Sequence, residues 1–294
     1  MLLAVGASRA AAQIADDESM APKKTLITGV FYAHDSWDQY WEGTLKRRNG
    51  NIGTLTTQTV TSMVGYGVAE RFSVTAALPY VWTQASQGTL HGLSGIQDLT
   101  LTAKYRLLTT RPSELGAFSA FLAGTAAVPM TNYTPDFLPL SIGSGGGRAS
   151  GHFTLNFQST SAWFVNASAA YTWCSNVRLN RNSYYTNGTL YLTNQVAMPN
   201  VTDYALTAGI NRGRWRIPLT LLEQRTLGGS DIRRQDMPFV SNRMDFAKLD
   251  GSVMYSLPVP KDLSLRIGAA HVLSGRNVGQ STTLTTGVLY ALHF

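Results

Sequence analysis

The sequence predicts an all-β protein, a single transmembrane antiparallel up-and-down β-barrel of about 12 strands with short periplasmic turns and long extracellular loops. Apolar and polar side chains alternate over segments of roughly 11 to 16 residues, whereas strands of soluble proteins have a mode near 5–6. Only 14% of the residues are charged, where about 25% is typical of soluble domains. No run of about 18 apolar residues occurs, so nothing in the sequence can span a bilayer as a helix.

The alternation places the strands, and the segments between them set their connections. We expect strands at 26–42, 53–66, 71–84, 95–107, 115–130, 148–159, 162–175, 202–211, 214–226, 242–257, 263–274 and 282–294. Short links at 67–70, 108–114, 161, 212–213 and 258–262 alternate with longer ones such as 130–147 and 176–201. This order is typical of a bacterial outer-membrane barrel, with the short turns and both termini on the periplasmic side.

The two faces of single strands support a barrel in lipid. Leu99, Leu101, Ala103, Tyr105 and Leu107 share one face of the fourth strand, and Asp98, Thr100, Thr102, Lys104 and Arg106 share the other. Aromatic residues stand at both ends of the third and seventh strands, as in the girdles at membrane interfaces. A soluble β-sandwich would alternate in the same way, but its strands are shorter.

The last strand ends on an aromatic residue, with apolar side chains at every second position before it. Val288, Tyr290 and Leu292 face lipid in this interpretation, and Phe294 lies at the periplasmic rim. The terminal strand must pair with the first strand to close the barrel. We expect these four residues to form the signal that the barrel-insertion machinery reads.

The N-terminal segment resembles the remnant of a signal peptide. An apolar run is followed by Ala10-Ala11-Ala12, which predicts cleavage after Ala12, so residues 1–12 are a signal remnant and residues 13–294 the barrel. The one cysteine, Cys174, cannot form an intramolecular disulfide and is interpreted as a small strand residue.

Basic residues are spread over the polar connecting segments, which does not indicate nucleic-acid binding. They include Lys46-Arg47-Arg48, Arg178 with Arg181, Arg233-Arg234 and Arg276. On outer loops these side chains would meet lipopolysaccharide phosphates, so the expected partners are outer-membrane lipid and lipopolysaccharide.

Two neighbouring stretches carry a family resemblance. They are Gly65–Tyr80, which ends in Leu-Pro-Tyr, and Ser94–Tyr105, a hairpin with Asp98 at its centre and Gln97 where the family pattern has Gly. The sequence resembles the transporter-like outer-membrane family named for the meta-pathway of phenol degradation. The resemblance implies a small outer-membrane channel for hydrophobic or aromatic compounds.

The interior of the barrel is where function would reside, because ionisable groups at membrane depth normally turn toward water or pair. Face assignment places seven charged residues inside: Asp98, Lys104, Arg106, Arg216, Lys248, Asp250 and Arg266. One interpretation is a lumen plugged by mutually paired side chains. The other is a constricted pore whose net positive lining favours anions or polarisable aromatics.

Other chemistry finds little support in the sequence. His152 with Thr154, and His271 before Ser274, lack an orienting acid, so a lipid hydrolase is only a third hypothesis. His34, Asp35 and Asp38 could bind a cation but are more typical of a solvated loop edge. The Gly-rich segment 143–147 lacks the Gly-Lys-Ser/Thr ending of a phosphate loop and is interpreted as a flexible outer loop.

The expected function is therefore passive uptake of small hydrophobic or aromatic solutes through an outer-membrane channel, without a cofactor or metal. The main alternative is a structural barrel with a plugged lumen and no transport. The long segment 176–201, with several tyrosines and Asn187-Gly188, is expected to form a hairpin or folded loop above the barrel.

Overall fold

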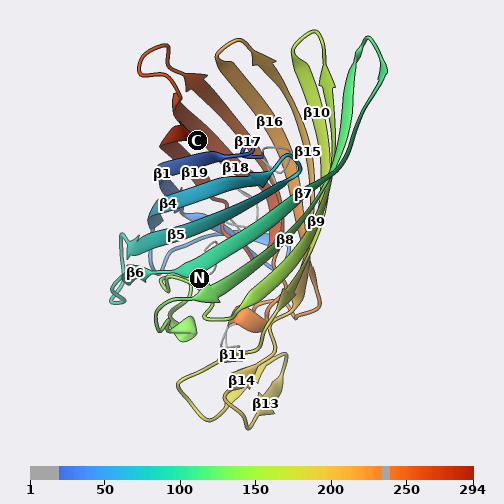
Figure 1. Cartoon of the computed structure of the whole chain (residues 1–294). Helices are drawn as coiled ribbons and strands as arrows, with labels where there is room; N and C mark the ends of the chain where they lie inside the picture. Colours follow the sequence, from blue (N-terminus) through green and yellow to red (C-terminus); the bar gives the residue numbers. More distant parts are fainter. Residues whose placement is uncertain (1–19, 234–238) are drawn as a thin grey trace.

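The computed structural model describes residues 20–233 and 239–294. The expected signal remnant at residues 1–12 lies outside the described residues. Twelve long antiparallel strands form one closed barrel, as the sequence predicted (Figure 1). They are β1 (Thr25–Trp37), β4 (Leu55–Ala69), β5 (Phe72–Ala85), β7 (Asp98–Ser113), β8 (Gly116–Pro129), β9 (Arg148–Ser159), β10 (Trp163–Cys174), β15 (Asn200–Arg212), β16 (Trp215–Leu227), β17 (Asp245–Ser256), β18 (Leu263–Arg276) and β19 (Thr282–His293).

Each of these strands pairs with its neighbours in the chain, and the first strand closes the ring. β1 pairs with β4 on one side and with β19 on the other, where Thr25 lies opposite His293 and Ser36 opposite Thr282. Closure gives each of the twelve strands a partner on both sides. The shortest of these pairings joins residues 72–77 of β5 to residues 100–105 of β7, so the rest of β7 extends beyond its contact with β5. A short additional strand, β6 (Ser94–Ile96), pairs with β5 beside β7.

The two ends of the barrel differ in their connections. Turns at 70–71, 114–115, 160–162, 213–214 and 257–262 gather at one end, called here the short-turn end, which is uppermost in Figure 1. The connections at 38–54, 86–97, 130–147, 175–199, 228–244 and 277–281 gather at the other, called here the long-loop end. The alternation of short and long links predicted from the sequence is thus confirmed.

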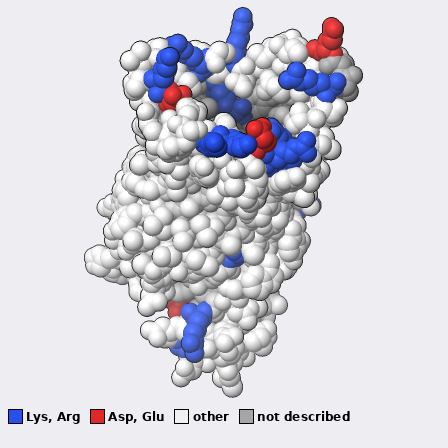
Figure 2. All heavy atoms as spheres, viewed as in Figure 1, with Lys and Arg blue, Asp and Glu red and all other residues white. Residues whose placement is uncertain are grey.

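Polar and apolar faces follow the predicted alternation. On β10, Trp163, Tyr171 and Trp173 are exposed on the outside of the barrel, while Asn166 and Ser168 between them are buried inside. The same holds around the ring, so the outer wall is an apolar belt that carries few charged side chains in Figure 2. Lipid is the solvent that such a belt fits.

Aromatic side chains border this belt at both ends. Near the long-loop end the rings of Tyr32 and Trp82 lie 6.4 Å apart between centroids. Near the short-turn end, Phe157 and Trp163 are 5.1 Å apart, and Trp215 and Tyr255 are 4.4 Å apart. These pairs match the interfacial girdles expected from the sequence.

One predicted strand was too long. The segment 26–42 was expected to be continuous, but β1 ends at Trp37 and the chain turns into β2 (Gln39–Glu42), which pairs with β3 (Leu45–Arg48). The reason is local: Trp37, Tyr40 and Trp41 are all buried, a spacing that a strand with a period of two cannot place on one face.

The remaining short elements are β11 (Val177–Arg178), β12 (Tyr184–Thr186), β13 (Thr189–Tyr191), β14 (Gln195–Val196), η1 (Pro135–Phe137) and η2 (Phe239–Ser241). Across the described ranges no helix is long and apolar enough to cross a membrane.

Candidate functional site: the barrel interior

The β2–β3 hairpin folds into the long-loop end of the barrel. Trp41, only 8% exposed, belongs to one buried apolar cluster with interior-facing residues of five adjacent strands. These are Ala170, Ala205, Leu222, Phe246 and Val272, joined by Val278 from the last loop. Because the cluster includes the inner faces of β10 and β15 to β18, the hairpin lies within the mouth and obstructs it.

Asn277 anchors the hairpin. Its side-chain oxygen accepts hydrogen bonds from the backbone N–H of Gly43 at 2.7 Å and of Ile232 at 3.1 Å. Its side-chain nitrogen donates to the carbonyl of Arg243 at 2.8 Å. Asn277 is fully buried with a φ of 56°, a left-handed conformation that Asn tolerates better than most residues. One side chain thus ties the hairpin to the loop 228–244.

An ion pair reinforces this anchor. Arg276 donates two hydrogen bonds to the carboxylate of Asp231, both at 2.7 Å, and Asn277 donates a third at 2.8 Å. These donors, with Arg276 as the main contributor, hold the pKa of the Asp231 carboxyl below its usual value. The hairpin anchor therefore depends on a carboxylate that must stay ionised.

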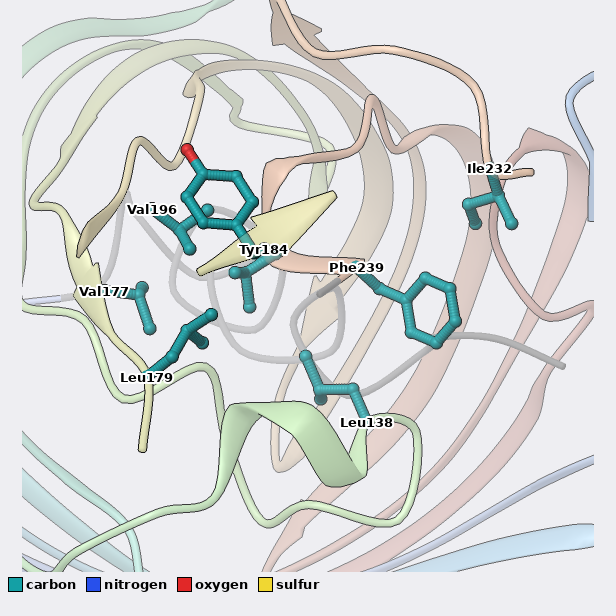
Figure 3. Close-up of a cluster of buried hydrophobic side chains, with 8 residues drawn as sticks. Leu138, Val177, Leu179, Tyr184, Val196, Ile232 and Phe239 are labelled. Atoms are coloured by element: carbon teal, nitrogen blue, oxygen red, sulfur yellow. The ribbon is translucent and has the colours of Figure 1, made fainter. Parts of the chain in front are cut away.

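A second apolar cluster joins three long loops over the same end, and Figure 3 shows its side chains converging. It comprises Leu138, Val177, Leu179, Tyr184, Val196, Ile232, Phe239 and Val240. The predicted hairpin in 176–201 is confirmed, with Asn187 and Gly188 at φ 48° and 79° in its turn. Two-residue turns of this kind require positive φ, which Asn-Gly supplies.

The loop 130–147 is fastened to the barrel wall. The Gln97 side-chain amide donates to the carbonyl of Ile142, and Thr83 donates to the carbonyl of Leu140 at 2.5 Å. The segment 143–147, which was expected to be a flexible outer loop, packs closely against its neighbours. Gly143 lies against Tyr133 so closely that an added Cβ would stand 2.8 Å from its ring. Gln97, which replaces the Gly of the family pattern, provides one of the fastening bonds.

Below the hairpin, the interior of the long-loop half holds acids and bases together. The Asp98 carboxylate is paired with Arg148 and accepts a hydrogen bond of 2.7 Å from the Tyr133 hydroxyl. Asp35, also buried, accepts one of 2.6 Å from Thr283. Arg148 neutralises the charge of Asp98, and the hydroxyl groups of Tyr133 and Thr283 solvate the two carboxylates without carrying a charge.

Asp203 and Lys248 complete this layer. Asp203 is 1% exposed, and neither of its carboxylate oxygens has a hydrogen-bond partner among the described residues. The basic side chains that interact with it electrostatically are His152, Lys248 and Arg148. Lys248 is 6% exposed and also interacts with Asp250 and Asp35.

The interior of the short-turn half is different, because cations dominate it. Lys104 and Arg106 of β7, Arg216 of β16 and Arg266 of β18 all lie on interior-facing positions and are partly exposed. Figure 2 shows a hollow at this end with Lys and Arg atoms around and inside it. The hollow and its four cations are called here the basic mouth.

Further cations surround the basic mouth. At the short-turn end the described basic residues outside the mouth are Lys23, Lys24, Arg71, Arg111, Arg212, Arg214 and Lys261, and the acidic ones are Glu70, Glu114 and Asp262. At the long-loop end, seven arginine–carboxylate pairs among the described residues balance most of the charge instead. The positive net charge of the described residues therefore resides mainly at the short-turn end.

The seven predicted interior residues lie at different depths along the barrel axis. Asp98 and Lys248 lie buried in the long-loop half, Asp250 lies between the halves, and the other four form the basic mouth. The sequence had treated these seven residues as one mixed ladder. Their role in lining a pore stays a prediction.

The terminal strand lies as the alternation indicated. Val288, Tyr290 and Leu292 are exposed on the outer face of β19, next to β1. Phe294 is 76% exposed, and its backbone N–H donates to the carbonyl of Lys24 at 2.9 Å. Whether these residues act as an assembly signal stays a prediction.

The two histidine motifs and the possible cation site do not converge. His152 accepts or donates a 2.8 Å hydrogen bond with Ser150, two residues earlier on the interior face. His271 contacts Thr282 at 2.9 Å on the outer wall. His34 and Asp35 are consecutive on β1 and point to opposite faces. Within the described chain, no group of three or more His, Cys, Asp or Glu side chains could hold a metal ion.

Sequence reasoning missed four residues that shape the interior. Trp41 had been placed on the first strand, and Arg148, Asp203 and Asn277 had not been selected. A signal did exist for Trp41 in the crowded aromatic spacing of 37–41. No local pattern distinguishes Asn277, because its partners come from two other loops that are distant in the sequence.

The comparisons with known proteins agree with this architecture. A family model described as "Putative MetA-pathway of phenol degradation" matches residues 46–286. The chain belongs to this family. The match runs from β3 into β19, so it covers nearly the whole barrel of this family member. No curated protein matches the sequence.

One solved structure shares the fold of this family member, and another is more loosely similar. An outer membrane channel from Pseudomonas putida F1 is 15% identical with a TM-score of 0.77, and the match covers 94% of this chain and 98% of the channel. The translocator domain of the autotransporter NalP from Neisseria meningitidis is 9% identical with a TM-score of 0.49, over 97% and 94% of the two chains. At 15% identity, the likeness to the channel concerns the fold.

Proposed function

We propose that the protein is a passive channel of the bacterial outer membrane that admits small hydrophobic or aromatic solutes. One observation carries the proposal: a closed barrel with an apolar outer wall encloses an interior lined by polar and charged side chains. The fold similarity to an outer membrane channel and the membership of a family described by phenol degradation support it. The short turns and both termini then lie in the periplasm.

The apolar clusters at the long-loop end suit a hydrophobic solute arriving from outside. Trp41 and the three-loop cluster offer apolar and aromatic contacts where a solute from the medium would first meet the protein. The stacked rings of Tyr184 and Tyr191, 5.0 Å apart, lie in the same loop group. Passage requires the β2–β3 hairpin to move aside, so the structure corresponds to a closed state of the proposed channel.

Transport would follow the solute gradient. The Gly-rich segment 143–147 is packed between Tyr133 and Val177 and is followed by a strand instead of a helix. A phosphate-binding loop needs a helix N-terminus after it. No energy source is therefore proposed.

A plugged barrel without transport is the second candidate. The hairpin and the three-loop cluster favour it, because they fill the long-loop end with buried apolar side chains. The two candidates differ in one respect: a channel opens when the hairpin is released, and a structural barrel has no path below the hairpin.

An enzymatic role is not proposed. Ser150 and His152 form the kind of hydrogen bond that a nucleophile and its base require. The nearby acid, Asp203, makes no hydrogen bond to any described residue, so it does not orient the histidine. A lipid hydrolase would also need its site at the lipid face, whereas these side chains are interior.

The other partners of the proposed channel are inferred from where certain residues lie in the barrel or in the sequence. The exposed loop cations Arg47, Arg48 and Arg178 would contact lipopolysaccharide phosphates at the outer surface. The terminal strand ending at Phe294 would be recognised by the barrel-insertion machinery. Residues 1–12 would direct export and be removed.

Liposome swelling tests the proposal. The purified protein and a variant in which a Gly-Ser linker replaces residues 39–48 are reconstituted, and the entry of arabinose and benzamide is compared with that into protein-free vesicles. We expect the linker variant to admit both solutes quickly and the native protein slowly. If neither protein admits either solute, the plugged barrel is correct.

A further inference from the structure

We infer that the basic mouth is a binding site for small organic anions, in particular carboxylates with an apolar or aromatic body. The inference rests on the proposed function for the direction of solute flow, and it narrows the solute class of that channel to molecules with a negative charge. Binding itself does not require the channel to conduct, so it can be tested separately.

The cations of the mouth come from opposite walls. Around the ring, β7 lies across from β17, and β17 is flanked by β16 and β18. Lys104 and Arg106 therefore face inward from one wall, and Arg216 and Arg266 from the other. Arg216 and Arg266 both neighbour Met254 in the register, which separates their Cα atoms by two strand spacings, about 10 Å. A small molecule can be reached by both arginines at once.

Apolar side chains stand next to these cations. The guanidinium of Arg216 lies 4.5 Å from the centroid of the Phe164 ring. Met254 lies between the two arginines, and Phe121 is opposite Arg106 in the register of β7 and β8. Guanidinium groups bind carboxylates through paired hydrogen bonds, and their planar faces stack on aromatic rings. The combination suits an anion that carries an apolar body better than a fully hydrated inorganic anion.

The side chain of Arg106 is held by an uncharged acceptor. Its side chain donates to the backbone carbonyl of Glu70 at 2.6 Å, a neutral acceptor, and its own backbone N–H binds the carbonyl of Arg71. The ring contact of Arg216 is likewise with an uncharged group. These two contacts orient the guanidinium groups, and neither contacted group carries a charge.

Acidic groups near the mouth are fewer than the cations. Asp250 lies deeper on β17, where it interacts with Lys248. At the rim, Asp262 is 3.4 Å from His293, and Glu70 and Glu114 are exposed in the turns. A hollow with low-dielectric walls and a surplus of one sign concentrates counter-ions. Since the long-loop half is balanced, anion binding should occur from the short-turn side.

Calorimetric titration of the purified full-length protein in a neutral detergent tests the site, with benzoate and benzamide as probes. The two molecules have similar shapes and differ in charge. We expect benzoate to bind and benzamide to bind at least about tenfold more weakly, as expected for the loss of a charge-assisted hydrogen bond. Equal binding of the two probes, or no binding of benzoate, would overturn the inference.

Variants locate the site. Arg216→Gln with Arg266→Gln should weaken benzoate binding about tenfold or more, and Lys104→Gln with Arg106→Gln should weaken it as well. The matched control is Arg178→Gln with Arg225→Gln, which removes the same charge from exposed positions at the long-loop end and should leave binding unchanged. If the control weakens binding as much as the mouth variants, the effect is one of net charge and the site is refuted.

Conductance measurements in planar lipid bilayers distinguish the anion-binding site from the proposed channel. With the hairpin replaced by the linker, a salt gradient should give a reversal potential that shows anion preference, and the double arginine variant should reduce this preference. Conduction without anion preference would overturn the inference and leave the channel intact. Absence of conduction together with specific benzoate binding would overturn the proposed channel and leave the site intact.

Discussion

The two halves of the barrel interior are built by the same strands but differ in how their charges are balanced and in how far their openings are filled. In the long-loop half, Asp98 is paired with Arg148, and the hairpin with Trp41 fills the opening at the long-loop end. In the short-turn half, cations stand around a hollow without a comparable number of acids. From this difference we infer that the first half serves to close the barrel and that the second serves to bind a charged molecule.

The largest expected effect concerns the closure of the ring itself, on which both halves depend. Deleting Phe294 should abolish most of the assembly, because the outer face of the last strand loses its terminal aromatic residue and the backbone contact with Lys24. Heat-modifiable mobility of the membrane-extracted protein measures the folded fraction. Phe294→Tyr, which keeps an aromatic ring, should assemble normally, and normal assembly of the truncated chain would refute the role of this residue.

The next effect compares a buried pair with an exposed one. Arg148→Ala leaves the buried carboxylate of Asp98 without its cation, and breaking a buried pair costs about 3 kcal/mol. Arg225→Ala removes an ion pair with Glu223 on the exposed outer face, where solvent screening should make the loss of stability much smaller. Urea unfolding of the two variants measures the difference, and equal losses of stability would contradict the division into two environments.

A smaller effect is expected from pH at the hairpin anchor. The pKa of Asp231 is depressed, mainly by Arg276, so its stabilising contribution is fully present above the unfolded value near about 3.9. It is lost as the pH falls through the lower folded pKa. Opening of the channel in bilayers should therefore be unchanged between about pH 7 and pH 5 and should increase below about pH 4.

Asp231→Asn is the control for this prediction. An amide cannot form the ion pair with Arg276, so the variant should open more often already at neutral pH and should lack the acid-dependent increase. The same acid response in the variant and in the native protein would show that another carboxyl controls the hairpin.

Most of the fold could be predicted from the sequence because the environment of each strand face is constant. The residues of β10 alternate between lipid and interior along its whole length, so a period of two indicates both faces. The closing pair of β1 and β19 followed from the need to satisfy every backbone group in lipid. The seven interior charges were found by the same rule.

The division of those charges between the halves could not be predicted. It depends on where each residue lies along the barrel axis and on what the loops place above it. Trp41 is buried by residues from 170 to 278, and Asn277 joins the hairpin to the loop 228–244. Such contacts between distant segments leave no periodic signal in the chain.

The single-channel conductance of Trp41→Ala, measured beside that of the native protein, tests whether the β2–β3 hairpin closes a channel. Loss of the indole removes the packing that holds the hairpin against the inner faces of β10 and β15 to β18, a change that costs about 3 kcal/mol in a packed core. We expect rare, brief openings for the native protein and frequent or sustained openings for the variant, with both proteins folded as barrels. A folded variant that conducts no more than the native protein would contradict it.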